Sequence, residues 1–396
     1  MLMTKKVKNN LVAPPLGVGE TSGIYIHIPF CKQACHYCDF HFSTSLKKKD
    51  DLLAALVAEL ALRKEEVSET VGTIYFGGGT PSLLSASELD MLIHAVYTHF
   101  NVSEAPEITL EANPDDLSEA YLEQLVASAV NRLSIGVQSF FEEDLKLMNR
   151  AHDASEAERC IELAKKYFDN ISIDLIYGIP EMTNERWLAN LEKALAYQIP
   201  HLSCYALTVE PKTALERFIA KGIVAPVDDA VAEAHHQLLV AHTERAGYEN
   251  YEFSNFCLPG KQSRNNSAYW QGKSYLGIGP SAHSYDGNRR SWNIANNPKY
   301  LKEVSNGRLP ITRETLSVND KYNEHVMTRL RTSNGISLAE ISEVFGERFT
   351  AYLLKMAQPH IDQGRLAQIN HHLVVTKKGK FLSDGIAADL FLVRLE

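Results

Sequence analysis

The sequence predicts an α/β protein: a partial (β/α)6 barrel of parallel strands followed by a small, helical, winged-helix-like domain. Two observations support this fold class. Short segments rich in Ile, Val, Tyr and Leu alternate along the chain with longer segments of helical character, as in buried parallel sheets. Polar residues follow the ends of five consecutive apolar segments, where ligands bind in folds of this kind.

The strand and helix segments can be placed by their apolar runs. The predicted strands are residues 23–30, 73–79, 107–113, 132–138, 170–177 and 201–209. The predicted helices begin near Asp51 and cover 86–99, 118–129, 154–168 and 184–197.

Changes in composition divide the chain into four parts. The predicted parts are a disordered extension at 1–22, a core barrel at 23–245, a connecting region at 246–314 and the C-terminal domain at 315–396. The extension begins with lysines, but Pro14 and Pro15 interrupt it and it has no adequate apolar core, so we do not expect a signal peptide.

The C-terminal segment predicts helices followed by a small hairpin. Its predicted elements are a short helix with apolar positions Ile336, Leu338, Ile341 and Phe345, a helix over 347–363 ending at Gly364, a hairpin over 366–376 and a final helix after Thr376. A winged helix with Lys377, Lys378 and Lys380 suggests nucleic-acid binding. A net charge of -9 argues against it, so we expect a packing or partner-docking role.

Composition limits the class of protein. The 396 residues are 45% hydrophobic and 22% charged, which is ordinary for a globular protein. No apolar run reaches the roughly 18 residues of a membrane span, so we expect at most peripheral membrane contact. Without a secretory signal, the expected location is the reducing cytoplasm, where a structural disulfide is not expected.

Three cysteines lie close together after the first predicted strand, as Cys31-x3-Cys35-x2-Cys38. Three thiolates on one loop can bind three irons of a cubane cluster and leave the fourth iron open. A zinc site completed by His36 or His41 is the alternative. Cys160, Cys204 and Cys257 are scattered and read as buried apolar residues.

Four polar segments follow later strands. Gly77-Gly78-Gly79-Thr80 is either a close approach to a ligand or a tight turn, and it lacks the ending of a P-loop. Glu111 is either a ligand-binding carboxylate or a structural one. Gly136-Val137-Gln138-Ser139 ends the fourth strand. Asp174 interrupts an apolar strand and is expected to face a polar pocket inside the barrel.

The ordered series of motifs carries a family resemblance. Tyr25-Ile-His-Ile-Pro-Phe-Cys31, GGGTPS, LEANP, SIGVQSF, LMNRAH and ISIDLIYGIP resemble the radical S-adenosylmethionine (radical SAM) superfamily, in its oxygen-independent coproporphyrinogen III oxidase branch. The resemblance spans roughly residues 23–290. It implies a [4Fe-4S] cluster, S-adenosylmethionine at its open iron and radical chemistry supplied by these cofactors.

The resemblance also implies roles for individual residues. Cys31, Cys35 and Cys38 would hold the cluster; Tyr25, Gly78 and Glu111 would form the first S-adenosylmethionine site. Gln138, Arg150 and Asp174 would line that pocket, and Tyr37, Gly79, Thr80 and Ala206 match positions that touch a second S-adenosylmethionine in the oxidase. Arg150 suits a carboxylate partner because its guanidinium can donate two parallel hydrogen bonds.

Within this branch the chain resembles the HemW type of heme chaperone. The oxidases carry a fourth cysteine where this chain has Phe40, and they have a longer N-terminal region. The resemblance implies heme as cargo, respiratory or other proteins as heme acceptors and an electron donor for the cluster. Two alternatives remain: coproporphyrinogen III dehydrogenase, an enzyme of porphyrin biosynthesis, and a zinc-stabilised regulatory protein. The sequence leaves enzymatic turnover open.

The heme motif departs from the family pattern. HemW-type proteins carry His-Asn-x-x-Tyr-Trp, whereas this chain reads Asn265-Asn-Ser-Ala-Tyr269-Trp270. A side-chain amide is a poor iron ligand, so we expect Tyr269 and Trp270 to matter more for heme than Asn265. His283 is an alternative ligand nearby in sequence, or a histidine hydrogen-bonded within its loop.

Overall fold

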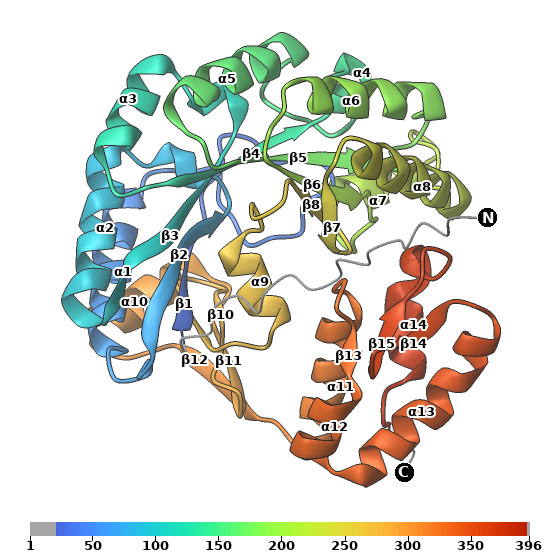
Figure 1. Ribbon diagram of the computed structural model, residues 1–396. Helices are drawn as coiled ribbons and strands as arrows, with labels where there is room; N and C mark the ends of the chain where they lie inside the picture. Colours follow the sequence, from blue (N-terminus) through green and yellow to red (C-terminus); the bar gives the residue numbers. More distant parts are fainter. Residues whose placement is uncertain (1–20, 394–396) are drawn as a thin grey trace, which may run out of the picture.

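The chain forms a curved sheet wrapped by helices, with a smaller domain beside it (Figure 1). This computed structural model describes residues 21–393. The extension predicted over 1–22 lies outside the described residues except for Thr21 and Ser22, which are the first two residues of strand β1 and buried or half-buried. The α/β barrel predicted from the sequence is confirmed.

Six parallel strands form the centre of the sheet, in sequence order. They are β1 (Thr21–Ile28), β2 (Thr70–Gly78), β3 (Val102–Ala112), β4 (Arg132–Gln138), β5 (Ile171–Tyr177) and β6 (His201–Ala206). Every residue of β4 is buried, which explains the continuous apolar character of the predicted strands.

Helices cover the outer face of these strands. They are α1 (Lys49–Leu62), α2 (Ala86–His99), α3 (Glu119–Ala127), α4 (Glu142–Leu147), α5 (Ala154–Tyr167), α6 (Asn184–Ala196), α7 (Ala214–Ala220) and α8 (Asp229–Arg245), with short 3-10 turns at Pro81–Leu83 and Pro114–Asp116. Capping boxes at Ser85 and Asp153 start α2 and α5, because each side chain accepts a bond from the third helical N–H.

The region expected to connect two domains belongs to the sheet itself. Strands β7 (Glu249–Glu252) and β8 (Asn255–Cys257) extend the β6 edge. Strands β9 (Tyr275–Ile278), β10 (His283–Tyr285), β11 (Arg289–Asn293) and β12 (Ile311–Thr315) extend the β1 edge. Helix α9 (Arg264–Trp270) packs on β1 and β2, and α10 (Asn297–Ser305) packs on α1.

The C-terminal domain has a hydrophobic core of its own. Its elements are α11 (Val318–Leu330), β13 (Ile336–Ser337), α12 (Leu338–Phe345), α13 (Glu347–Asp362), β14 (Leu366–Ile369), β15 (His372–Val375), a 3-10 turn at Lys380–Leu382 and α14 (Ser383–Asp389). The predicted long helix ends as expected before Gly364, whose φ of 67° is the left-handed conformation common after helices.

The basic side chains of this domain face the protein rather than solvent alone. Lys377 forms an ion pair of 2.6 Å with Glu244 of α8. Lys380 donates to the side-chain oxygen of Asn250, and burial lowers its pKa to about 8. Arg331 lies between the rings of Phe253 and Trp270, 5.1 Å from each centroid. Lys377 and Lys380, two of the three lysines that had suggested nucleic-acid binding, therefore contact the barrel together with Arg331, whereas Lys378 bonds the Gln363 carbonyl within its own domain.

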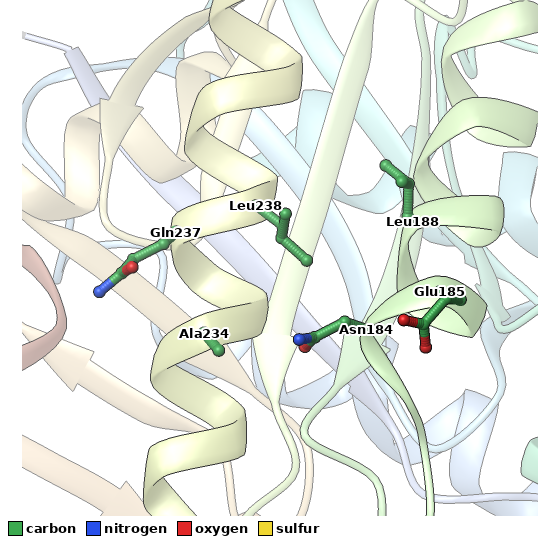
Figure 2. A pocket seen from close by; sticks show the side chains of 6 residues that line it. All are labelled: Asn184, Glu185, Leu188, Ala234, Gln237 and Leu238. Atoms are coloured by element: carbon green, nitrogen blue, oxygen red, sulfur yellow. The ribbon is translucent and has the colours of Figure 1, made fainter.

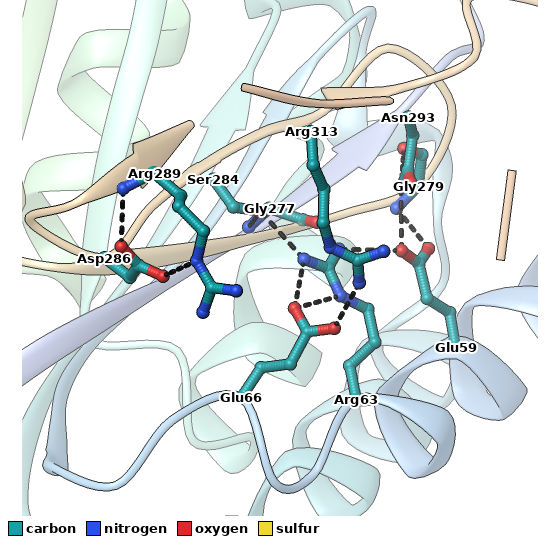
Figure 3. Close-up of polar contacts among 10 residues, drawn as sticks. All are labelled: Glu59, Arg63, Glu66, Gly277, Gly279, Ser284, Asp286, Arg289, Asn293 and Arg313. Carbon is teal, nitrogen blue, oxygen red and sulfur yellow. Dashed lines mark hydrogen bonds and ion pairs between the residues drawn. The ribbon is translucent and has the colours of Figure 1, made fainter. Parts of the chain in front are cut away.

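A buried polar network attaches the β9–β12 strands to α1 (Figure 3). The carboxylate of Glu59, fully buried, accepts bonds from Arg63, Asn293, Tyr300 and the Gly279 N–H at 2.5–3.0 Å. Arg63 also donates to the Gly277 carbonyl at 2.8 Å. Four donors, one of them a guanidinium, compensate the burial of one carboxylate, so the network fixes these strands in place.

Within residues 21–393, no helix combines the length and the apolar character needed to cross a bilayer.

Candidate functional site: the cysteine loop and the barrel interior

The cysteine loop leaves β1 and is held by contacts from far along the chain. Asn149 donates to the Ala34 carbonyl at 2.8 Å, and the His36 N–H donates to the Met148 carbonyl at 3.0 Å. On its other side, the Leu215 N–H at the start of α7 donates to the His36 carbonyl at 2.8 Å. The LMNRAH motif therefore acts as a support that fixes the loop conformation.

The three thiols share one partly exposed environment. Burial raises the pKa of Cys31 and raises that of Cys38 to about 11, and neighbouring thiols raise both values further. Thiolates at this loop need a positive partner to be stable, which iron supplies. The residues present therefore fit a cluster.

In the zinc alternative, His36 and His41 would each have one ring nitrogen left for the metal. The His36 ring bonds to the Leu147 carbonyl at 2.8 Å, and the His41 ring bonds to Asn297 at 2.7 Å. Among residues 21–393, no three Cys, His, Asp or Glu side chains are arranged to hold one ion. Ligands of one ion converge on a point, whereas the thiolates of a cubane bind separate irons, so the arrangement disfavours zinc.

Arg150 links the cysteine loop to the strand ends. One guanidinium nitrogen is 3.4 Å from the Cys35 sulfur, and the other donates to the Asn113 side chain at 2.6 Å and to the Gly136 carbonyl at 2.8 Å. Its buried Nε has no partner within the described chain. That orphaned donor points to a missing acceptor, as an anionic ligand in the pocket would provide.

Glu111 lies at the end of β3 inside the barrel. Its carboxylate accepts from the Tyr75 hydroxyl at 2.8 Å and from the Gly78 N–H at 3.2 Å. Burial raises its pKa to about 7, and the hydrogen bonds only partly offset that effect. Glu111 can therefore hold or release a proton near neutral pH.

The glycine triplet is explained first by the protein's own packing. A Cβ on Gly77 would lie 2.8 Å from the Tyr25 ring, and one on Gly79 would collide with the Phe30 carbonyl. The Gly78 N–H bonds Glu111, and the Gly79 N–H bonds the Ile28 carbonyl at 2.9 Å. These two N–H groups are therefore already engaged by the protein, and the packing of Gly77 and Gly79 agrees with the tight-turn alternative.

The remaining predicted site residues lie on β4 to β6 or beside the cysteine loop. Asp174 accepts from Ser134 at 3.3 Å, and burial raises its pKa to about 6 while Arg132 opposes that rise. Gln138 is in the left-handed conformation, with φ 67°, at the end of β4. Thr80 bonds the Cys31 thiol, Tyr37 lies beside Arg150, and half-buried Ala206 ends β6.

Sequence reasoning missed the side chains that support these groups. Tyr75 holds Glu111 and stacks on Tyr25 with ring centroids 6.1 Å apart. Asn113 accepts from Arg150, and Arg132 moderates Asp174. The available signal was the strand alternation: Tyr75 lies two residues before Gly77, so both are on one face of β2.

Residues 25–194 match the model of the radical SAM superfamily, and residues 316–382 match that of the HemN C-terminal domain. The chain is 34% identical to heme chaperone HemW of Escherichia coli, covering 96% of this chain and 98% of that one. It is also 34% identical to heme chaperone HemW of Mycobacterium tuberculosis, covering 94% and 95%.

The chain belongs to the HemW family of radical SAM proteins. Among solved structures it resembles coproporphyrinogen III oxidase (HemN) from Escherichia coli, with a TM-score of 0.81 and 25% identity over 94% of this chain and 90% of that one. Radical SAM proteins bind a [4Fe-4S] cluster and S-adenosylmethionine, and the thiols, Arg150 and Glu111 suit those cofactors chemically.

In the HemW motif of α9, the first residue, Asn265, is bonded to other protein groups rather than free to bind a ligand. Asn265 accepts a hydrogen bond from the Thr73 hydroxyl at 3.1 Å, and its N–H bonds Glu107. Trp270 packs under Arg331, whereas Tyr269 is 47% exposed. The exposed ring of His283 stacks on Trp292, with 5.9 Å between the ring centroids.

A separate cavity of about 370 Å³ lies between α6 and α8 on the outer helical layer (Figure 2). Its lining residues are Asn184, Glu185, Leu188, Ala234, Gln237 and Leu238. None of them is a predicted site residue.

Proposed function

We propose that this protein is a heme chaperone that binds a [4Fe-4S] cluster and S-adenosylmethionine and passes heme to acceptor proteins. The observation that carries the proposal is the full-length similarity to proteins named heme chaperone HemW, at 34% identity from two distant bacteria. Phe40 in place of a fourth cysteine agrees with it.

Cys31, Cys35 and Cys38 would hold the cluster in this proposal. Their shared environment beside the Arg150 guanidinium supports the assignment, since a nearby cation favours thiolates. When bound, the cluster and S-adenosylmethionine together supply radical chemistry.

The first S-adenosylmethionine would lie over Tyr25, Gly78 and Glu111. Glu111 would accept hydrogen bonds there, and the free Nε of Arg150 would meet a carboxylate. Gln138 and Asp174 would close that pocket. Tyr37, Gly79, Thr80 and Ala206 would contact a second molecule.

The acceptors would be respiratory or other heme proteins, and a redox protein would reduce the cluster. We place the protein in the cytoplasm, because the cysteines of the described chain are free and a reducing compartment keeps cluster-binding thiols available.

Heme titration of the anaerobically reconstituted protein tests the proposal. We expect a saturable change in the Soret absorbance that ends near one heme per chain. Absence of saturable binding would overturn heme carriage.

A second candidate is oxygen-independent coproporphyrinogen III oxidation, favoured by the structural similarity to HemN over 94% of this chain. Protoporphyrinogen formed from coproporphyrinogen under anaerobic, reducing conditions would support this enzyme, and its absence alongside heme binding would exclude it.

A further inference from the structure

One face of the β9–β11 extension carries half-exposed aromatic side chains. The Tyr275 ring lies 5.6 Å from Tyr269 of α9 and 6.2 Å from Tyr285 of β10. In the next row, His283 stacks on Trp292 with an angle of 25° between the rings. We call these five side chains the aromatic face.

The opposite face of the same strands is buried and fixed. Ser284 receives a hydrogen bond from Arg63 at 3.1 Å, and Asn293 donates to Glu59 (Figure 3). Side chains alternate along a strand, so the strand neighbours of Ser284 and Asn293 point to the opposite face of the sheet, away from α1. These neighbours are His283, Tyr285 and Trp292. The aromatic face is therefore presented on a rigid support.

The ring of His283 is available as a ligand. No hydrogen bond joins it to another residue of the described chain, whereas the rings of His36 and His41 are each held through one nitrogen. Partial burial and the neighbouring Arg290 lower its pKa, so the ring is neutral at pH 7. A neutral imidazole with a free nitrogen is a good iron ligand.

Arg290 places a positive charge at the same surface. Its charge acts on His283, Tyr275 and Tyr285, so it lies among the members of the aromatic face. It forms an ion pair with Glu324 of α11 and keeps 43% side-chain exposure. A cation beside flat apolar rings suits a planar ligand with carboxylate substituents.

Strand register places His283 near the expected cofactor pocket. Gly277 of β9 is the partner of Tyr25, and a Cβ on Gly277 would run into the backbone of His283. His283 is thus two strands from Tyr25 at the same level, roughly 10 Å away at the usual strand spacing.

We propose that heme docks on the aromatic face, with the free imidazole of His283 as an axial iron ligand. The proposal rests on the proposed heme chaperone function and names the site within it. In this proposal His283 of β10 takes the iron-ligand role of the family histidine that this chain replaces with Asn265.

The test compares heme titrations of the reconstituted wild-type chain, His283→Ala and His94→Ala. His94 is the matched control, because it is an exposed histidine on α2 outside the proposed site. We expect His283→Ala to weaken heme binding at least about tenfold and to shift the Soret band, as loss of a metal contact does. His94→Ala should match wild type.

Added imidazole provides a readout that a structural role would not move. In His283→Gly, free imidazole should restore the wild-type Soret position, because it can occupy the vacated place at the iron. If the alanine variant does not yield folded, cluster-loaded protein, His283→Gln serves instead.

The outcomes separate the two proposals. Wild-type affinity and spectrum in His283→Ala would overturn the His283 assignment and leave heme carriage standing. If the Soret band shifts in Tyr269→Phe but not in His283→Ala, the iron ligand is the Tyr269 phenol, and the His283 assignment is overturned. A wild-type chain that binds no heme would overturn the chaperone function itself.

Discussion

Burial opposes the ionisation of the Glu111 carboxyl, so the stability of the fold should depend on pH through this group. The pKa of Glu111 is raised in the folded chain to about 7 from its ordinary 4.5. Its contribution to stability is therefore greatest below pH 4.5 and is lost as the pH rises through about 7. Occupation of the pocket by a hydrogen-bond donor would favour the ionised form.

Replacing Glu111 with Gln should flatten the pH dependence of the cofactor-free protein. The wild-type free energy of unfolding should fall by up to about 3 kcal/mol from this group between pH 4.5 and 7, since one unit of pKa shift corresponds to about 1.4 kcal/mol. Urea unfolding at several pH values measures the slope. An unchanged slope in Glu111→Gln would contradict the burial effect.

We expect the side chain of Asn265 to affect stability rather than heme binding, because it is hydrogen-bonded to another protein group. Asn265→Ala removes the acceptor for the Thr73 hydroxyl, so we expect a loss of about 1 kcal/mol of stability. Heme affinity and the Soret position should stay at wild-type values, while Tyr269→Ala should weaken binding. Thermal unfolding and heme titration on the same samples measure both effects.

A heme affinity that falls in Asn265→Ala but not in Thr73→Ala would make the amide a heme contact and reverse this reading. Thr73→Ala is the matched control, since it removes the same hydrogen bond from the other side.

At the residue scale, sequence identifies polar groups whose burial would be costly but not their partners. Asp174 was expected to face a polar pocket from its apolar strand alone, and its carboxylate accepts a hydrogen bond from Ser134 of the neighbouring strand. The contact of Arg150 with Cys35 joins residues 115 positions apart. No local pattern encodes such a pairing, because it exists only once the strands are ordered.

Helix α9 depends on one buried carboxylate in β3. Glu107 accepts from the N–H groups of Arg264 and Asn265, each at 3.0 Å. These are among the first N–H groups of the helix and have no partners within it. A negative charge at this end also matches the helix dipole.

Glu107→Ala should loosen α9 and leave the cluster loop intact. Loss of a buried acceptor for two backbone donors should cost about 1–3 kcal/mol. Hydrogen exchange should rise in 264–270, and heme affinity should fall because Tyr269 is displaced. Glu104→Ala, an exposed acidic position on the same strand, is the control.

Wild-type exchange in 264–270 of the Glu107→Ala protein would show that α9 is held by its other contacts. Loss of cluster absorbance in that variant would instead indicate a wider role for Glu107.

At the element scale, periodicity located the strands and helices of the barrel well; helix α2 covers the predicted 86–99. The strands in 246–314 were missed. They have three to five residues of mixed polarity, too short for a clear alternation. Strand β9 pairs with β1, about 250 residues earlier in the chain, and such distant pairing leaves no mark in a local pattern.

The whole molecule depends on how these late strands attach to the first helix. The Glu59–Arg63 pair lies between α1 and the β9–β12 extension, and both side chains are at most 1% exposed. It connects an element at the beginning of the barrel with strands that complete the sheet (Figure 3). The aromatic face is on the other side of those strands.

Glu59→Ala should therefore destabilise the fold and the proposed heme surface together. The variant leaves the buried donors of Asn293, Tyr300 and Gly279 without their acceptor, which costs about 1–3 kcal/mol or more, although Arg63 keeps its ion pair with Glu66. Urea unfolding should show that loss, and limited proteolysis should cut first within 275–315. The exposed carboxylate variant Glu303→Gln should behave as wild type, because its partner Arg308 is in solvent. If Glu59→Ala keeps wild-type stability and resists protease, the network is not what holds the extension, and the support inferred for the aromatic face fails with it.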